Sequence, residues 1–172
     1  MNTKTILGLS LAAVFAVSIL GSAYAGNHLV FGANGITVEN TGKSQSVEIE
    51  IAVNVPSPTG FDYGWAVDSS NGGFVIVTTH PNIGDDSIAQ PPLDAYHTHF
   101  LTAEVSGPNC GTSPHATSAT KNEVGRLSIT GDTISVKNVP RGLAGDLAET
   151  GFSFKLAVTG GDLCINIVNT IP

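Results

Sequence analysis

Basic side chains are scarce in this chain of 172 residues. Lys and Arg together number 7 against 14 Asp and Glu, which gives a formal net charge of −7. A surface with that excess of negative charge repels the phosphates of nucleic acids and the headgroups of anionic membranes. Neither is therefore expected as a partner, and no particular protein partner is indicated.

Long apolar runs are also lacking, with one exception at the N-terminus. The run over residues 6–20 follows the positive charge of Lys4 and precedes a small-residue motif that ends at Ala25. This order of segments is typical of a secretory signal peptide. We expect residues 1–25 to be removed and residues 26–172 to form one exported domain, either secreted, periplasmic or at the cell surface. The mature chain has no further run of transmembrane length.

Cysteine is limited to Cys110 and Cys164. An exported chain with an even number of cysteines favours a disulfide. Closing that loop of about 55 residues would stabilise the fold by about 4 kcal/mol. The alternative is that Cys110 is a thiolate ligand beside His115, as in blue-copper sites. Those sites usually add a weak axial Met, and the expected mature chain contains none.

No stretch of the mature chain predicts a long helix, whereas many short stretches alternate apolar and polar residues with the period of a β-strand. The spacing of these stretches predicts an all-β domain, an antiparallel, Greek-key-like β-sandwich of roughly eight to nine strands. The predicted strands cover residues 46–55, 61–68, 74–77, 96–100, 124–130, 133–139, 152–159 and 163–168, with shorter candidates at 28–31 and 36–39.

Histidine is the residue type that indicates a possible functional site. His97 and His99 lie two apart in a predicted strand, so their side chains share one face at a spacing of roughly 6.6 Å. His115 follows in a Gly/Pro/Ser/Thr-rich loop that Cys110 would anchor. Together the three imidazoles could form a three-nitrogen metal site. The alternative is that these histidines have no ligand role. His80, which precedes Pro81, is interpreted as a solvated loop histidine, although it could supply another ligand.

The run His97-Thr98-His99-Phe100, followed by Cys110 and then His115, resembles the copper-site region of the Cu/Zn superoxide dismutases. Cys164-Ile165-Asn166-Ile167 is similar to the C-terminal cysteine segment of that family. The resemblance implies that His97 and His99 are copper ligands, that His115 is the bridging position, and that Cys110 pairs with Cys164. No histidine follows His115, so the later copper ligand and zinc ligands of the family have no counterpart. Gly161 stands where the family has its guiding arginine.

A second copper site is predicted at the new N-terminus. Cleavage after Ala25 would leave Gly26-Asn27-His28. The free amine, two deprotonated amides and the His28 imidazole could form a square-planar nitrogen site, which suits Cu(II) or Ni(II). The alternative is that His28 merely begins the first strand.

These features predict an exported β-sandwich protein that binds a transition metal through His97, His99, His115 and His28. Copper is the favoured metal and zinc the alternative, with a function in copper handling or redox protection. A structural or adhesive cell-surface β-sandwich without metal is the first alternative. A superoxide dismutase-like enzyme is the second, and no catalytic residue is assigned.

Overall fold

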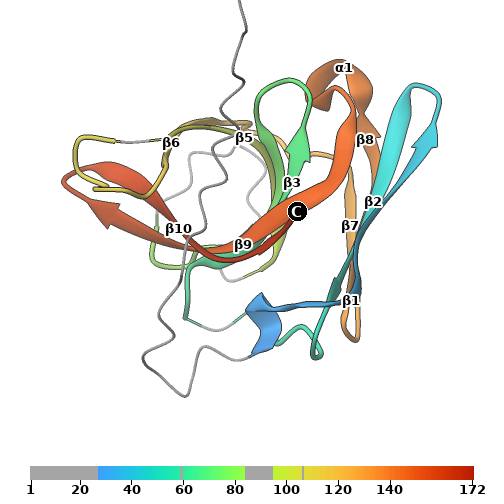
Figure 1. Cartoon of the computed structure of the whole chain (residues 1–172), viewed down its shortest axis with the longest axis horizontal. Helices are drawn as coiled ribbons and strands as arrows, with labels where there is room; N and C mark the ends of the chain where they lie inside the picture. The colour runs from blue at the N-terminus through green and yellow to red at the C-terminus, as the bar shows by residue number, and fades with distance from the viewer. Residues whose placement is uncertain (1–26, 59, 84–94, 106) are drawn as a thin grey trace, which may run out of the picture.

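The computed structural model describes residues 27–58, 60–83, 95–105 and 107–172, so the predicted signal peptide and Gly26 lie outside the described residues. Within these ranges the chain forms ten strands, one 3-10 helix and one short α-helix (Figure 1). None of the described helices is long and apolar enough to cross a membrane. The elements are η1 (Asn27–Leu29), β1 (Phe31–Thr41), β2 (Ser44–Ile51), β3 (Tyr63–Ser69), β4 (Phe74–Thr79), β5 (His97–Glu104), β6 (His115–Ala119), β7 (Arg126–Thr130), β8 (Thr133–Pro140), α1 (Arg141–Ala144), β9 (Leu147–Thr159) and β10 (Asp162–Ile171).

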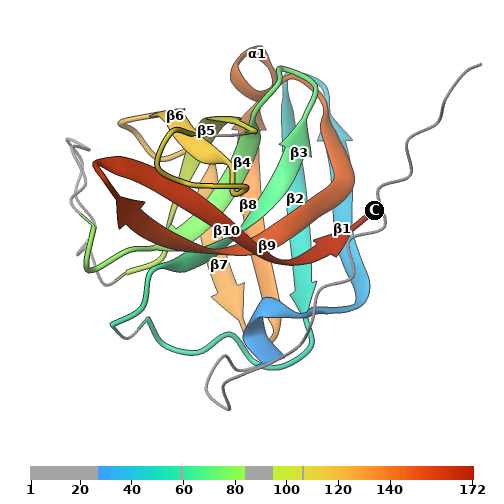
Figure 2. The same ribbon diagram turned by 60° about the vertical axis from the view of Figure 1, so that its left-hand side comes forward.

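Six of the strands described here close into a barrel in the order β10-β6-β5-β4-β3-β9. The other four form a sheet in the order β1-β2-β8-β7, which lies beside the barrel wall (Figures 1 and 2). Every pairing is antiparallel. The alternation of side chains therefore gives each barrel strand one face toward the lumen and one face toward the outside.

Two separate hydrophobic cores follow from this alternation. The first joins the sheet to the outer face of the barrel wall, because it includes Val47 and Ile134 from the sheet together with Trp65 and Val77 from the barrel. The second fills the lumen of the barrel. Its buried members are Ala66, Ile76, Leu101, Phe152, Phe154 and Ile165.

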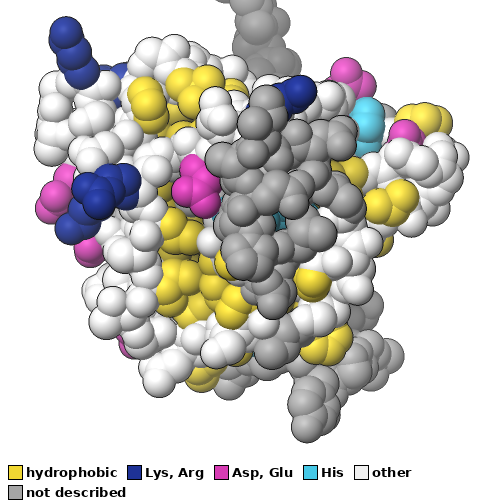
Figure 3. All heavy atoms as spheres, turned by 180° about the vertical axis from the view of Figure 1, so that it is seen from behind, with side chains coloured by type: hydrophobic (Ala, Val, Ile, Leu, Met, Phe, Trp, Pro, Cys, Tyr) yellow, Lys and Arg dark blue, Asp and Glu magenta, His cyan; other side chains and the backbone are white. Residues whose placement is uncertain are grey.

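Charged groups make up 12% of the residues, and on the face shown in Figure 3 they occupy only small areas among uncharged groups. Hydrophobic side chains also reach the surface of the molecule. Those most exposed among the described residues are Val105 at 85%, Phe61 at 64% and Val158 at 57%.

The predicted all-β, antiparallel class is confirmed, whereas the strand count and the sandwich are not. The described residues form ten strands, and one layer is a closed barrel. Residues 28–31 and 36–39 were predicted as separate strands. Residues 36–39 belong to β1, whereas of residues 28–31 only Phe31 does, because residues 27–29 form η1. The pairing of β1 is interrupted by a bulge between Phe31 and Ile36. The additional strand is β6, which lies within a predicted loop.

The predicted disulfide between Cys110 and Cys164 is confirmed, with their Cα atoms 5.4 Å apart. Cys110 is therefore not a thiolate ligand beside His115. The bridge lies where β6 meets β10, and the register there pairs Cys164 with His115. It thus covalently reinforces the shortest strand pairing of the barrel.

Candidate metal centre

Two histidines of β5 face the lumen at one end of the barrel. The register pairs His97 with Thr78 and His99 with Ile76, and Ile76 belongs to the lumen core. Directly paired residues project to the same side of a sheet, so both imidazoles point inward. His97 is only 1% exposed and His99 only 5%. The prediction that these two side chains share one face is confirmed.

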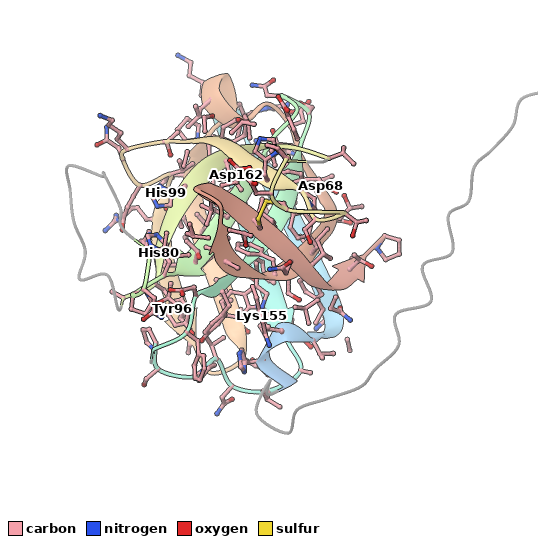
Figure 4. The ribbon with its side chains drawn as sticks, turned by 90° about the vertical axis from the view of Figure 1, so that its left-hand side faces the viewer. Asp68, His80, Tyr96, His99, Lys155 and Asp162 are labelled. Atoms are coloured by element: carbon pink, nitrogen blue, oxygen red, sulfur yellow. A yellow bond between two sulfur atoms is a disulfide. The ribbon has the colours of Figure 1, made fainter. Side chains whose placement is uncertain are left out.

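The third histidine of this group is His80, which follows the last residue of β4. Because β4 and β5 are neighbours, the chain leaving β4 carries His80 over the same end of the lumen. Its ring centroid lies 4.6 Å from that of His97 and 6.2 Å from that of His99. One ring nitrogen from each of the three side chains lies within 4.8 Å of the others. Figure 4 shows His80 and His99 next to each other.

Backbone carbonyl groups hold all three rings through the same nitrogen. Nδ1 of His80 lies 3.1 Å from Ile83 O, Nδ1 of His97 lies 3.0 Å from Ala95 O, and Nδ1 of His99 lies 2.6 Å from Thr120 O. A carbonyl oxygen can only accept, so each Nδ1 carries the hydrogen and donates it. That tautomer leaves the lone pair on Nε2, which is the arrangement of histidines that bind metals through Nε2.

The Nε2 atoms of His80 and His97 lie 2.7 Å apart. Two lone pairs repel each other at this distance, so the contact requires a proton or a metal ion between the rings. Two nitrogens bound to one tetrahedral metal ion at about 2.0–2.1 Å lie roughly 3.3 Å apart. A small opening of the His80–His97 pair would therefore make room for an ion, and the donor set fits a metal that prefers imidazole.

The lumen beneath the three rings is apolar. Ile76 and Phe154 are 3% and 0% exposed. The ring of Phe154 packs against the backbone of Gly64, its cross-strand partner, because glycine has no side chain. A Cβ at residue 64 would lie 2.8 Å from the Phe154 ring. Thr78 of β4 is the polar cross-strand partner of His97, and its hydroxyl donates to Tyr63 O at 2.9 Å.

An aromatic cluster fixes the start of β5 from the outer side of the barrel. The hydroxyls of Tyr96 and Tyr63 are hydrogen-bonded to each other, and Tyr96 also donates to Pro56 O at 3.0 Å. Burial, together with the hydrogen bond to Tyr63, raises the pKa of Tyr96 well above its ordinary value. The phenol therefore stays neutral and keeps the residue that precedes His97 in place.

His115 lies elsewhere in the barrel. It is the first residue of β6 and pairs with Glu104, the last residue of β5, and with Cys164 of β10. Glu104 lies roughly 16 Å along the strand from His99, at about 3.3 Å per residue. His115 is not a member of the three-histidine group that the described residues form. The structure brings His97 and His99 together with His80 instead, and His80 is a buried residue, not a solvated one.

His28 belongs to η1 and is not a member of the three-histidine group. Its ring lies 4.9 Å from the ring of Tyr63, and its carbonyl accepts a hydrogen bond from Trp65 Nε1 at 3.1 Å. Burial, followed by the positive charge of Lys155, lowers the pKa of His28 below its ordinary value. Gly26 lies outside the described residues, so the amino-terminal copper site stays a prediction.

The chain matches no family model, and neither a curated protein nor a solved structure matches it. Nothing in these comparisons bears on the resemblance to Cu/Zn superoxide dismutases, which also stays a prediction. The assignment of a function therefore depends on the geometry of the histidine group.

Proposed function

We propose that this protein is an exported β-protein that binds a transition metal ion through His80, His97 and His99, with copper as the favoured metal and zinc as the alternative. Its role would be copper handling or redox protection. The supporting observation is that one nitrogen from each ring converges within 4.8 Å while each Nδ1 faces a backbone carbonyl. Such outer hydrogen bonds fix the tautomer that a metal ion requires.

The chemistry of the donors favours copper. Imidazole suits copper and zinc, and copper leads the divalent affinity order of the first-row metals. An extracytoplasmic location agrees with the disulfide, because such bonds persist in oxidising compartments.

Metal content and titration test the proposal. Protein purified from an exporting host is to be analysed for bound metal, stripped with a chelator, and titrated with copper and zinc salts. We expect one equivalent per chain at the histidine group. His97→Ala should weaken binding by at least about 100-fold, because losing an outer-shell partner alone typically costs 10–100-fold.

His115→Ala is the matched control, since His115 lies outside the group. It should bind metal as the wild type does. If the His115 variant loses the metal and the His97 variant keeps it, the assignment of ligands is wrong. If no variant and no wild-type sample binds metal, the alternative of a structural or adhesive protein replaces this proposal. Superoxide consumption by copper-loaded protein tests the dismutase alternative.

A further inference from the structure

A hollow lies on the four-stranded sheet, on the face that is turned away from the barrel. Its volume is about 180 Å³, and its lining comes from β1, β2 and β8: Asn34, Gly35, Thr37, Glu48, Glu50 and Thr133. None of these residues is a member of the three-histidine group. Pockets for drug-sized ligands measure about 300–1,000 Å³, so this smaller hollow suits an ion or another small ligand.

Two carboxylates reach the hollow because of the alternation along β2. Glu48 and Glu50 lie two residues apart, and Ile49 between them faces the core against the barrel. Both carboxylates therefore project to the opposite, outer face. Thr37 pairs with Glu48 and Thr133 pairs with Glu50, so each carboxylate has a hydroxyl group as its cross-strand neighbour.

The bulge of β1 holds Glu50 in place. Its Oε1 accepts a hydrogen bond from Ala33 N at 3.0 Å, and its Oε2 accepts one from the side-chain amide of Asn34. Gly32 makes room for the carboxylate, because a Cβ at that residue would lie 2.5 Å from Glu50 Oε1. An ionised carboxylate has about four lone-pair sites, so these two bonds orient the group and leave it able to bind an ion.

A buried hydroxyl beside the hollow lacks a partner. Ser135 of β8 is 7% exposed, and its Oγ makes no hydrogen bond within the part of the chain that the structure describes. Ser135 lies directly opposite Glu48, and directly paired residues project to the same side of a sheet. A buried polar group without a partner calls for one, such as a bound water molecule or ion.

The donors around the hollow are oxygen atoms of carboxylates, hydroxyls and one amide. Ca²⁺ takes six to eight oxygen ligands in flexible geometry, and water molecules can be among them. Mg²⁺ demands a near-ideal octahedron and gives up its water reluctantly. Transition metals prefer imidazole or thiolate, which the lining does not offer.

We infer that the outer face of the sheet binds Ca²⁺ through the carboxylates of Glu48 and Glu50, with the neighbouring hydroxyls and water completing the site. Calcium sites of extracellular modules have dissociation constants of about 10⁻⁴–10⁻³ M, and we expect this range for an exported chain. The inference is independent of the proposed function, because it involves none of the three histidines.

The test is a calcium titration of the full mature protein after removal of metals with a chelator. Tm is followed against CaCl₂ concentration, with NaCl keeping the ionic strength constant. A ligand that binds only the folded state raises Tm as its concentration increases, so Tm should rise with CaCl₂. The amide NMR signals of β2 should shift in the same concentration range. MgCl₂ should act at concentrations at least about tenfold higher.

Glu48→Gln removes one carboxylate with little change of shape and should weaken Ca²⁺ binding at least about tenfold. Glu39→Gln is the matched control, since Glu39 is an exposed carboxylate of β1 outside the lining of the hollow. It should respond to Ca²⁺ as the wild type does. Ser135→Ala should weaken binding at least about threefold. Circular dichroism establishes that each variant is folded.

The outcomes are distinct for the two metal sites. The inference is overturned if Tm and the NMR signals of the wild type do not respond to CaCl₂, or if the Glu48 and Glu39 variants respond equally. His97→Ala should leave the calcium response unchanged, and a loss of that response in this variant also overturns the inference. None of these results alters the test of copper and zinc binding by the histidine group.

Discussion

A hydrogen bond connects His99 to the residue that follows the neighbouring strand β6. Thr120, the residue after β6, accepts the Nδ1–H of His99 through its carbonyl oxygen. Its hydroxyl accepts a hydrogen bond from Phe100 N at 3.0 Å and donates one to Asn122 O at 3.1 Å. The side chain of Thr120 therefore holds in place the carbonyl group that orients His99.

Thr120→Val should lower metal affinity by up to about tenfold, since outer-shell changes typically cost 10–100-fold and the carbonyl itself is kept. The lost hydroxyl bonds should also reduce the free energy of unfolding by about 1–3 kcal/mol. Isothermal titration and urea denaturation measure the two effects. Thr117→Val, at an exposed hydroxyl that bonds to Thr102, is the control. Equal metal affinities in both variants would show that Thr120 does not orient His99.

The stability of the fold is expected to depend on pH through His28. Its pKa in the folded state is lowered by burial and by Lys155, so the unfolded chain takes up a proton more readily than the folded chain. The stability that neutral His28 contributes is thus present above about pH 6.5 and is lost as the pH falls from there through the folded pKa. His28→Gln removes this proton uptake. As the pH is lowered from 7.5 to 5, the Tm of the wild type should fall further than the Tm of the variant. A difference independent of pH would contradict the assignment.

At the scale of the strand, the disulfide secures the closure of the barrel. Cys164 pairs with His115, and Ile165 N donates to Pro114 O at 2.8 Å. Apart from this short contact, β6 is held by β5. The bridge from Cys110 therefore supports the strand that leads to Thr120 and its contact with His99.

Replacing both cysteines by serine should cost about 2–5 kcal/mol in the free energy of unfolding. It should also weaken metal binding, because β6 and the following Thr120 carbonyl lose their covalent support. Chemical denaturation and metal titration of the double variant check both effects. Unchanged metal affinity in a destabilised variant would show that β6 keeps its place without the bridge.

The strand elements differ in how far the sequence could predict them. His97 and His99 were assigned correctly because a period of two needs no information beyond the strand itself. β6 was missed because its side chains are half-buried or exposed and show no alternation. His80 was missed because Pro81 signals a turn, and the sequence cannot reveal that this turn folds over the lumen. His115 was included because nearness along the chain was taken for nearness in space.

For the whole molecule, the two hydrophobic cores share the barrel wall. Trp65 belongs to the core against the sheet, whereas its neighbour Ala66 belongs to the lumen core. A wall shared in this way should make the two cores unfold together. The sequence could predict which residues are apolar but not this division, because closure of the barrel depends on contacts between distant strands.

Ile49→Ala in the core against the sheet and Ile165→Ala in the lumen should each cost about 2–5 kcal/mol, since both side chains are fully buried. Fluorescence of Trp65, the single tryptophan, and far-ultraviolet circular dichroism should report the same transition in each variant. Two separated transitions in either variant would show that the cores unfold independently.

The strand register of the barrel also affects the order in which, and the rate at which, this chain folds. Tyr63 of β3 pairs with Lys155 of β9, so the barrel cannot close before nearly the whole chain is available. Pairing over such long separations gives folding times of roughly milliseconds to seconds. The three histidines, in contrast, lie within residues 80–99: His80 follows β4, and His97 and His99 lie on the neighbouring strand β5. Bringing such nearby residues together costs little loop-closure entropy. Under the proposed function, an exported chain would bring these histidines together early and close its barrel late, so a metal ion would be captured before the lumen is sealed.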